Sequence, residues 1–336
     1  MNPKVNGQLQ HYWDWFLAIY LFLGGLGSGA YAITVINTFL GIRDSMINKL
    51  LTTVGLWISF PALLIGTLFL TLDLGTPGRA FLAGLKPKTS WISRGFWIIS
   101  IFMVLSFLHL ILHLFSKDAV TTVGTTGGAI ITLISVVGII FAFGTMAYTG
   151  LLLGASKGIP FWRAGGEPVV FMFAALATGL FAIILGVTFV SPTGAGLRHM
   201  QLLALEAAIL LFLELLAIIF FLLEAFHQPD PRESAERILR EPMFIIGYFV
   251  LGLVVPFILM LIVFFTAPAI GTGATFALTA IGAILGLVGG LILRHSVLIC
   301  GALPTLNIAG FDFRRIHRPK EPKPAIGLVP PGNVAS

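Results

Sequence analysis

Eight long apolar stretches constrain the fold of this chain more than any other feature of its sequence. Each contains about 20 or more residues, the length that an α-helix needs to cross a hydrocarbon core of roughly 30 Å. Charged residues make up only 10% of the chain, whereas soluble domains contain about 25%. We therefore predict an all-α integral membrane protein in which eight transmembrane helices form a bundle. The expected spans are 15-41, 47-72, 94-115, 127-153, 168-190, 200-226, 242-267 and 273-300.

We expect residues 1-301 to form the membrane domain and residues 302-336 to form a proline-rich tail. The tail is too short to build a core, so it should be extended. It gains order only by lying on another surface, which leaves docking to a partner subunit and plain disorder as alternatives. The first 15 residues, MNPKVNGQLQHYWDW, contain one lysine and no apolar core, so we do not expect them to be a cleavable signal peptide.

The longest polar interruption in the first half of the chain is DLGTPGRAFLAGLKPKTSWISRG, at residues 73-95. Its prolines and glycines end helices, and the hydroxyls of Thr89 and Ser90 can cap the helix that follows. Trp91 is of the type found at membrane interfaces, and Asp73 stands where the preceding span ends. We interpret the segment as a shaped connector at the membrane surface that faces a partner.

The basic residues are distributed unequally between the two sides of the predicted bundle, although the net charge is only +6. By the positive-inside rule, both termini would be cytoplasmic. A basic surface that docks a partner would produce the same distribution. The N-terminal side carries Lys4, Arg79, Lys86, Lys88, Arg94, Lys157, Arg163, Arg232, Arg237, Arg240, Arg314, Arg315, Arg318, Lys320 and Lys323, and the opposite side carries Arg43, Lys49, Lys117 and Arg198.

Two tyrosines and an aspartate are candidate ligand-binding residues on the N-terminal side. Asp14 and Tyr20 lie near the start of the first span, where an acid and a phenol either anchor the helix or contact a ligand. Tyr148 lies about two turns inside the basic side, at the end of the fourth span. A buried phenol usually finds a hydrogen-bond partner, so Tyr148 is the stronger candidate.

Small residues and uninterrupted apolar sequence mark two spans as packing elements. Gly25 and Gly29 are four residues apart in the first span and favour close contact between helices. The fifth span has no charge between Glu167 and Ser191. We expect that span to face lipid or to pack within the bundle.

The sixth span contains three glutamates. Carboxylates inside a membrane are energetically costly and are commonly functional. At least Glu214 falls in the hydrocarbon region. Glu206 and Glu224 each lie about 80° from Glu214 around the helix, so the three do not form a single stripe. Either they mark different depths of one polar route, or Glu206 and Glu224 reach the surface and Glu214 makes a buried hydrogen bond.

Two histidines and an arginine are further polar residues of the spans with candidate roles. His109 and His113 are four residues apart and so share one helical face. This pair raises the possibility of haem ligation, but the remaining histidines lie mostly at helix ends or in tails, which favours interfacial or proton-handling roles. Arg294 needs a carboxylate, a carbonyl or a ligand oxygen, and its candidate acidic partners are Asp14, Asp73 and Glu214.

Cys300 is the sole cysteine of the chain. One cysteine excludes an internal disulfide, a CxxCH haem attachment and a cysteine-ligated iron–sulfur cluster within this chain. Any such electron-carrying centre must therefore belong to another subunit.

Three sequence segments together resemble the NrfD/PsrC family, the membrane subunits of polysulfide-reductase-like complexes. They are YLFLGGLGSGAY in the first span, DLGTPGRAF followed by SWISRGFW around the connector, and AYTGLLLGASKGIPFW at the end of the fourth span. They occur in the family's order. The resemblance implies a haem-free, quinone-reactive membrane anchor in a prokaryotic inner membrane, working with an iron–sulfur subunit and often a molybdenum or tungsten catalytic subunit.

The resemblance also implies where the quinone binds. The family's pocket lies near the iron–sulfur partner, between the start of the first helix and the end of the fourth. Tyr148 matches the pocket tyrosine, and Tyr20 stands where a well-studied pocket has a histidine. Asp14, Trp91 and Arg294 are the further candidates for quinone contact, and the neighbouring asparagine of that pocket has no clear polar counterpart here.

Residues and resemblance together predict exchange of electrons between menaquinol or ubiquinone and the iron–sulfur partner. Tyr148 would hold one ring oxygen, with Asp14, Tyr20, Asp73 or Arg294 near the other. Glu214 would relay protons, and Glu206 with His109 or His113 would continue the route. The alternatives are a haem b-bearing anchor, suggested by the two histidines, and a secondary transporter, suggested by helices broken at glycine and proline.

Overall fold

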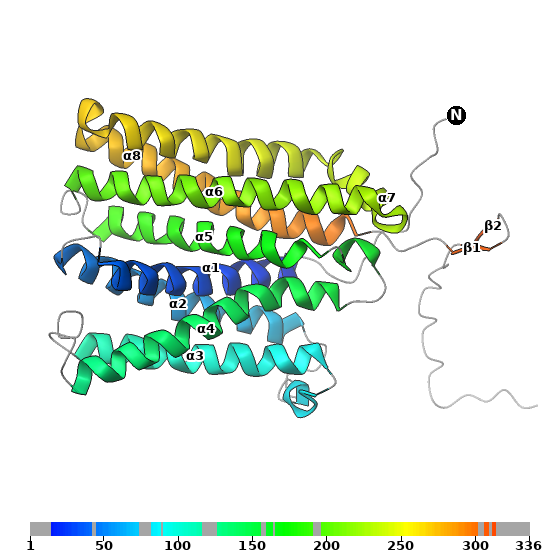
Figure 1. The fold of residues 1–336 in the computed structure, drawn as a ribbon, viewed down its shortest axis with the longest axis horizontal. Helices are drawn as coiled ribbons and strands as arrows, with labels where there is room; N and C mark the ends of the chain where they lie inside the picture. The colour runs from blue at the N-terminus through cyan, green and yellow to red at the C-terminus, as the bar shows by residue number, and fades with distance from the viewer. Residues whose placement is uncertain are drawn as a thin grey trace, which may run out of the picture.

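The computed structural model describes residues 15–41, 45–73, 82–88, 90–115, 126–155, 159–163, 165–190, 196–301, 306–308 and 311–313. Within these residues the protein is a bundle of long helices, most of which follow the long axis of the molecule (Figure 1). Seven helical segments of the described residues are long and apolar enough to cross a membrane. The prediction of a helical protein with several membrane spans is therefore confirmed.

The first six long helices match the predicted spans to within a few residues. The third begins at Trp91 rather than at residue 94, because the Ser90 hydroxyl accepts a hydrogen bond from the backbone N–H of Ser93 at 3.4 Å and caps the first turn. The bounds are α1 (Trp15–Leu40), α2 (Ser45–Asp73), α3 (Trp91–Phe115), α4 (Thr126–Gly154), α5 (Glu167–Val190) and α6 (Gly196–His227).

The last apolar segment is 57 residues long and runs from Met243 to Ile299. It starts as a π-helix, η3 (Met243–Val254), and continues as α8 (Val255–Ile299). Gly271 interrupts α8 with φ 80° and ψ 170°, a conformation essentially restricted to glycine. The predicted division into helices at 242-267 and 273-300 is thus confirmed, while the number of membrane crossings stays a prediction.

The two arms of this last segment fold back on each other, as the yellow and orange ribbons show (Figure 1). Gly252 and Gly289 face each other where the arms touch. A Cβ atom added to either glycine would overlap the backbone of the other. Small residues thus set the spacing of this helical hairpin.

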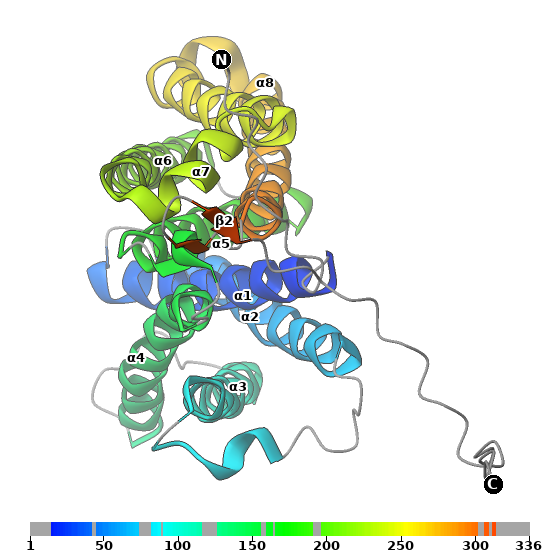
Figure 2. The same cartoon turned by 90° about the vertical axis from the view of Figure 1, so that its right-hand side faces the viewer.

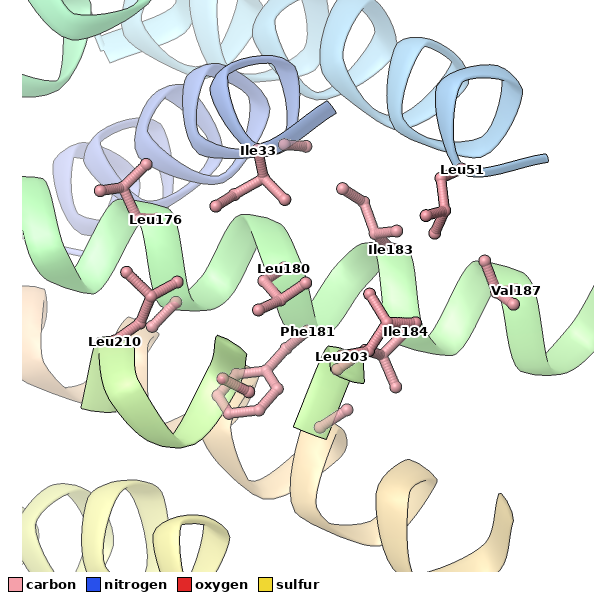
Figure 3. Packing of buried hydrophobic residues seen from close by; sticks show 14 of the residues in the cluster. Ile33, Leu51, Leu176, Leu180, Phe181, Ile183, Ile184, Val187, Leu203 and Leu210 are labelled. Atoms are coloured by element: carbon pink, nitrogen blue, oxygen red, sulfur yellow. The ribbon is translucent and has the colours of Figure 1, made fainter. Parts of the chain in front are cut away.

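Helix α5 lies in the middle of the bundle, among α1, α4, α6 and α8 (Figure 2). Its side chains pack toward α1 and α2 on one side and toward α6 on the other (Figure 3). A Cβ atom on Gly29 of α1 or on Gly179 of α5 would overlap the other helix's backbone. Of the two alternatives for this span, packing within the bundle is confirmed, and Gly29 has the predicted role in it.

One end of the bundle gathers the starts of α1, α3 and α5 and the ends of α2, α4, α6 and α8 (Figures 1 and 2). A short surface helix, α7 (Pro229–Ile238), and a 3₁₀ turn, η2 (Pro160–Arg163), lie here too. We call this the α7 end and the opposite one the far end. Helix α7 lies at the surface with one face packed on the bundle, since Ala235 and Ile238 are buried while Arg232 is exposed.

The tail contains two short strands, β1 (Leu306–Ile308) and β2 (Phe311–Phe313), paired antiparallel. Leu306 pairs with Phe313, and Ile308 pairs with Phe311. These six residues are extended. The other residues of 302-336 lie outside the described part of the protein.

Candidate functional site

Two buried tyrosines from different helices lie at the α7 end. Tyr148 of α4 and Tyr20 of α1 belong to one cluster of buried side chains and lie near each other. The Tyr148 ring lies directly against Gly95 of α3, where a Cβ atom would overlap the ring. We call Tyr20, Tyr148 and Gly95 the tyrosine pocket; it joins three of the segments singled out in the sequence.

Trp91 lies at the surface beside this pocket, at the first residue of α3. Its side chain is 41% exposed, and the guanidinium of Arg94 stacks over its ring at 4.6 Å from the centroid. Arg94 also donates to the carbonyl oxygens of Pro87 at 2.9 Å and Lys88 at 3.0 Å. These contacts fix the end of the connector against α3, and they fit an interfacial anchor.

The two aspartates of the predicted site are only partly placed. Asp14 and Thr89 lie outside the described residues. Asp73 is the last residue of α2, so its backbone stands at the α7 end as expected, but its side chain is outside the described part of the structure. Their contacts to a ligand therefore stay predictions.

A completely buried arginine lies deeper in the bundle, between α1, α5 and α8. Arg294 is 0% exposed. Its Nε donates to the Leu21 carbonyl oxygen at 3.1 Å and its Nη1 donates to the Gly290 carbonyl oxygen at 2.8 Å. Its Nη2 is buried and has no hydrogen-bond partner among the described residues, so the guanidinium keeps one free donor.

Gly25 makes room for this guanidinium. A Cβ atom at this position would lie 2.6 Å from Arg294 Nη2, which is too close for two unbonded atoms. The rings of Phe22 and Phe171 flank the guanidinium at 5.7 and 5.6 Å, within the range of cation–π contacts. Gly25 therefore accommodates the arginine in addition to its predicted packing role.

Glu214 is the predicted acidic partner that the structure brings to Arg294. The carboxylate is buried, interacts electrostatically with Arg294, and accepts a hydrogen bond from the Tyr248 hydroxyl at 2.9 Å. Tyr248 lies in the π-helix η3, a form of backbone that occurs often at functional sites. We call Arg294, Glu214 and Tyr248 the arginine cluster.

The two histidines of α3 lie toward the far end and point into the bundle. His109 Nδ1 is 3.0 Å from the Tyr31 hydroxyl, which also donates to the Ile134 carbonyl at 3.3 Å. His113 Nε2 is 2.8 Å from the Thr53 hydroxyl. The prediction that both share one helical face is confirmed. Among the described residues, no group of three or more His, Cys, Asp or Glu side chains is arranged to hold a metal ion.

The other glutamates of α6 accept hydrogen bonds from an amide side chain and from backbone N–H groups. Both carboxylate oxygens of Glu206 accept from the Asn37 amide, at 3.0 and 3.3 Å. Glu224 accepts from the backbone N–H groups of Gly165 and Gly166, each at 3.0 Å. Glu224 thus holds the turn before α5, which is a structural role.

The polar groups along α1 stand at separate depths. Arg294 is bonded at Leu21, His109 at Tyr31 and Glu206 at Asn37. At a rise of 1.5 Å per residue, these levels are about 15 Å and about 9 Å apart. Arg294, His109 and Glu206 therefore mark three polar stations at separate levels along α1.

Aromatic residues close the α7 end around α8. Trp15 stacks on His295 with ring centroids 3.8 Å apart, and Trp162 Nε1 donates to the Val297 carbonyl at 3.0 Å.

Cys300 follows α8 and is buried. Burial raises the pKa of its thiol to about 12, which keeps it protonated and unreactive at neutral pH.

Comparison with known families now identifies the protein's relatives. The family described as "Polysulphide reductase, NrfD" matches residues 4–305, which is nearly the whole sequence. The chain belongs to the NrfD family. The resemblance seen in the three sequence segments is therefore confirmed.

Individual NrfD-family relatives are distant. The C component of polysulfide reductase from Wolinella succinogenes is 23% identical over 283 residues, covering 76% of this protein and 86% of the relative. The C component of selenate reductase from Mesobacillus selenatarsenatis is 25% identical over 198 residues, covering 50% of this protein and 46% of the relative. Protein NrfD of Escherichia coli K12 is 26% identical over 185 residues, covering 50% of this protein and 57% of the relative.

Three buried polar residues of this NrfD-family protein were not predicted from the sequence. Tyr248 is the single phenol of an otherwise apolar stretch, and Tyr31 is the second phenol of the first span; a phenol in a membrane span is a signal that could have been used. Glu167 was treated only as the boundary of the fifth span. The structure shows that its side chain is buried.

Proposed function

We propose that the protein is the membrane subunit of a reductase complex and that it exchanges electrons between membrane quinone and an iron–sulfur partner subunit. Membership of the NrfD family supports the membrane-subunit role. Two relatives carry the names of parts of a polysulfide reductase and a selenate reductase. The chemistry of the terminal substrate then belongs to a separate catalytic subunit that contains molybdenum or tungsten.

The tyrosine pocket is the observation that carries this proposal. Converting a quinone to a quinol adds two electrons and two protons, so each ring oxygen needs a hydrogen-bonding group and a proton source. Tyr148 and Tyr20 bring two phenols from different helices to one place near the α7 end. Gly95 lets the Tyr148 ring lie against α3.

We assign the ring oxygens of the quinone to residues on either side of this pocket. Tyr148 holds one oxygen, and the second lies near Tyr20, Asp14, Asp73 or Arg294. Arg294 suits an oxygen acceptor because its Nη2 is an unused donor within the described structure. Trp91, at the surface, lies where the isoprenoid substrate would pass from lipid to protein.

In this proposal, protons reach the quinone through buried polar side chains that lie at different depths in the bundle, which we call stations. Glu214 is the first station, held by Tyr248 and facing Arg294. Glu206, His109 and His113 are the later stations toward the far end. Their hydrogen bonds to Asn37, Tyr31 and Thr53 orient these side chains.

The partner subunit would dock on the α7 end, with both termini on the cytoplasmic side of a prokaryotic inner membrane. Docking at this end places the tyrosine pocket close to the partner's cluster, which shortens the electron-transfer distance. The excess of arginine and lysine at this end fits both the orientation rule and a docking surface.

The test is oxidation of a soluble menaquinol analogue by the detergent-purified complex, with and without Tyr148→Phe. We expect the substitution to lower turnover about 100-fold, because it removes a proton-transferring hydroxyl and keeps the ring. The matched control is Gly24→Ala, since a Cβ atom on Gly24 meets nothing within 4 Å. The proposal fails if the intact complex does not exchange electrons with quinol, or if Tyr148→Phe retains full turnover with all subunits bound.

A further inference from the structure

A second buried acid stands at the α7 end, apart from the glutamates of α6. Glu167 is the first residue of α5 and is only 1% exposed. Both of its carboxyl oxygens are buried without a hydrogen-bond partner among the described residues. An ionised carboxylate in such a place is very costly, so the group is held as a neutral carboxylic acid.

Hydrogen-bond donors lie next to Glu167, but they are bonded to another residue. The backbone N–H groups of Gly165 and Gly166, which directly precede it, donate to Glu224 instead. A free N–H group before a helix is the natural partner of a carboxylate at the helix start. Because Glu224 occupies these donors, the Glu167 carboxyl is left available for another reaction.

Helix packing places Glu167 at the depth of the tyrosine pocket. A Cβ atom on Gly150 would lie 2.9 Å from Pro168 N, so Glu167 is level with Gly150, about 3 Å along α4 from Tyr148. Gly25 faces Ala175 where α1 and α5 pack together. From this contact, Glu167 is eight residues back along α5 and Tyr20 is five residues back along α1. At a rise of 1.5 Å per residue, the two residues therefore differ by about 5 Å in depth.

Glu167 also stands above the arginine cluster on one face of α5. Phe171 lies one turn further along that face, and its ring contacts the Arg294 guanidinium. Arg294 Nη2 of α8, beside Phe171, and the Glu167 oxygens of α5 are thus both buried and unbonded within the described structure. Gly165, two residues before Glu167, is exposed, so the position of Glu167 lies two residues along the chain from the solvent-exposed surface of the α7 end.

We propose that Glu167 is a proton-exchanging acid of the quinone site, an inference that rests on the proposed function. When quinone accepts two electrons from the iron–sulfur partner, Glu167 gives its proton to one ring oxygen and becomes a carboxylate. The other ring oxygen receives its proton through Tyr148 from the route that starts at Glu214 in the proposed function. Water at the α7 end then reprotonates Glu167, and quinol oxidation runs through the same steps in reverse.

The first test examines the acid itself and needs no quinone activity. Infrared absorbance of the purified complex at neutral pH should contain the carbonyl band of a protonated carboxylic acid, which shifts in D₂O. The band of Glu167 should be missing in Glu167→Gln and present in Glu224→Gln, whose carboxylate is bonded to backbone. A Glu167→Gln spectrum identical to that of the wild type overturns the inference.

The second test measures proton exchange during turnover. Glu167→Gln should lower quinol oxidation at least tenfold, with the partner subunits bound and the affinity for a quinone-analogue inhibitor unchanged. Equal rates in Glu167→Gln and wild type overturn the role of Glu167 while leaving the quinone site intact. A wild-type complex that does not react with quinol contradicts the proposed function instead.

A third variant separates proton exchange from a structural role. Glu167→Leu removes an acid that makes no hydrogen bond within the described structure, so the thermal unfolding midpoint should stay the same or rise, because no bond is broken. Quinol oxidation should still fall at least tenfold. A clear drop in the midpoint would show that the carboxyl supports the fold, and it would overturn the inference.

Discussion

The tyrosine pocket and the arginine cluster are both buried, but they are built by different means. In the pocket, the Tyr148 ring is positioned by shape, because it fills the space left by Gly95. In the cluster, hydrogen bonds and charge hold the side chains, from Arg294 to two backbone carbonyls and from Tyr248 to Glu214. The position of the pocket tyrosine therefore depends on the missing side chain at Gly95, whereas the cluster depends on its hydrogen bonds and charges.

The largest expected effect is on stability, in the arginine cluster. Arg294→Met removes the two hydrogen bonds from the buried, charged guanidinium to backbone carbonyls, so we expect a loss of about 3–5 kcal/mol of unfolding free energy. Denaturant titration in mixed micelles measures this loss. Arg240→Met, at an exposed position, is the control and should change little. A stable Arg294→Met variant would show that the cluster does not hold the bundle.

The next effect tests shape in the tyrosine pocket. Gly95→Ala places a methyl group where the Tyr148 ring lies, so it should displace the ring and cost about 1–3 kcal/mol of stability. Quinol turnover should fall at least tenfold, because the hydroxyl moves with the ring. Gly24→Ala again serves as the control. Unchanged turnover in Gly95→Ala would mean that the ring position is irrelevant to the reaction.

A smaller effect tests the hydrogen bond inside the cluster. Tyr248→Phe leaves the buried Glu214 carboxyl without its donor, which should cost about 1–3 kcal/mol. A double-mutant cycle with Glu214→Gln isolates the interaction between the two side chains. We expect the effect of Tyr248→Phe to shrink when Glu214 is already replaced. Strictly additive effects would argue against the bond at 2.9 Å.

The smallest effect concerns the far end. Tyr31→Phe removes a hydrogen bond to the His109 ring, which should cost about 1 kcal/mol of stability. Thermal unfolding in detergent, compared with the wild type, measures this cost. A loss of stability as large as that of Arg294→Met would contradict this order, because it would mean that the far end stabilises the bundle as strongly as the arginine cluster does.

Much of the fold follows from the apolar pattern of the sequence. The long spans were predicted to within a few residues, and the break at Gly271 falls between the last two. The pattern does not show that α5 is central, because a helix in lipid and a helix in a protein interior are equally apolar. The close contact of Gly29 with Ala175 shows that α5 packs in the protein interior.

The site was predicted less completely than the fold. Spacing alone places His109 and His113 on one face. The need of Arg294 for a partner pointed to a carbonyl, a ligand oxygen or one of three acids, Asp14, Asp73 and Glu214. The involvement of Tyr248 depends on how the last two helices fold back, which no local pattern encodes. The burial of Glu167 also depends on packing, because a glutamate at a helix start is usually exposed.

Photolabelling with a menaquinone analogue that carries a reactive group on its ring tests the central claim most directly. We predict adducts on the start of α3 around Gly95 or on α4 beside Tyr148, abolished by excess menaquinol and lost in Gly95→Leu. Adducts at the far end near His109, or labelling that menaquinol does not compete, would contradict a quinone site at the tyrosine pocket.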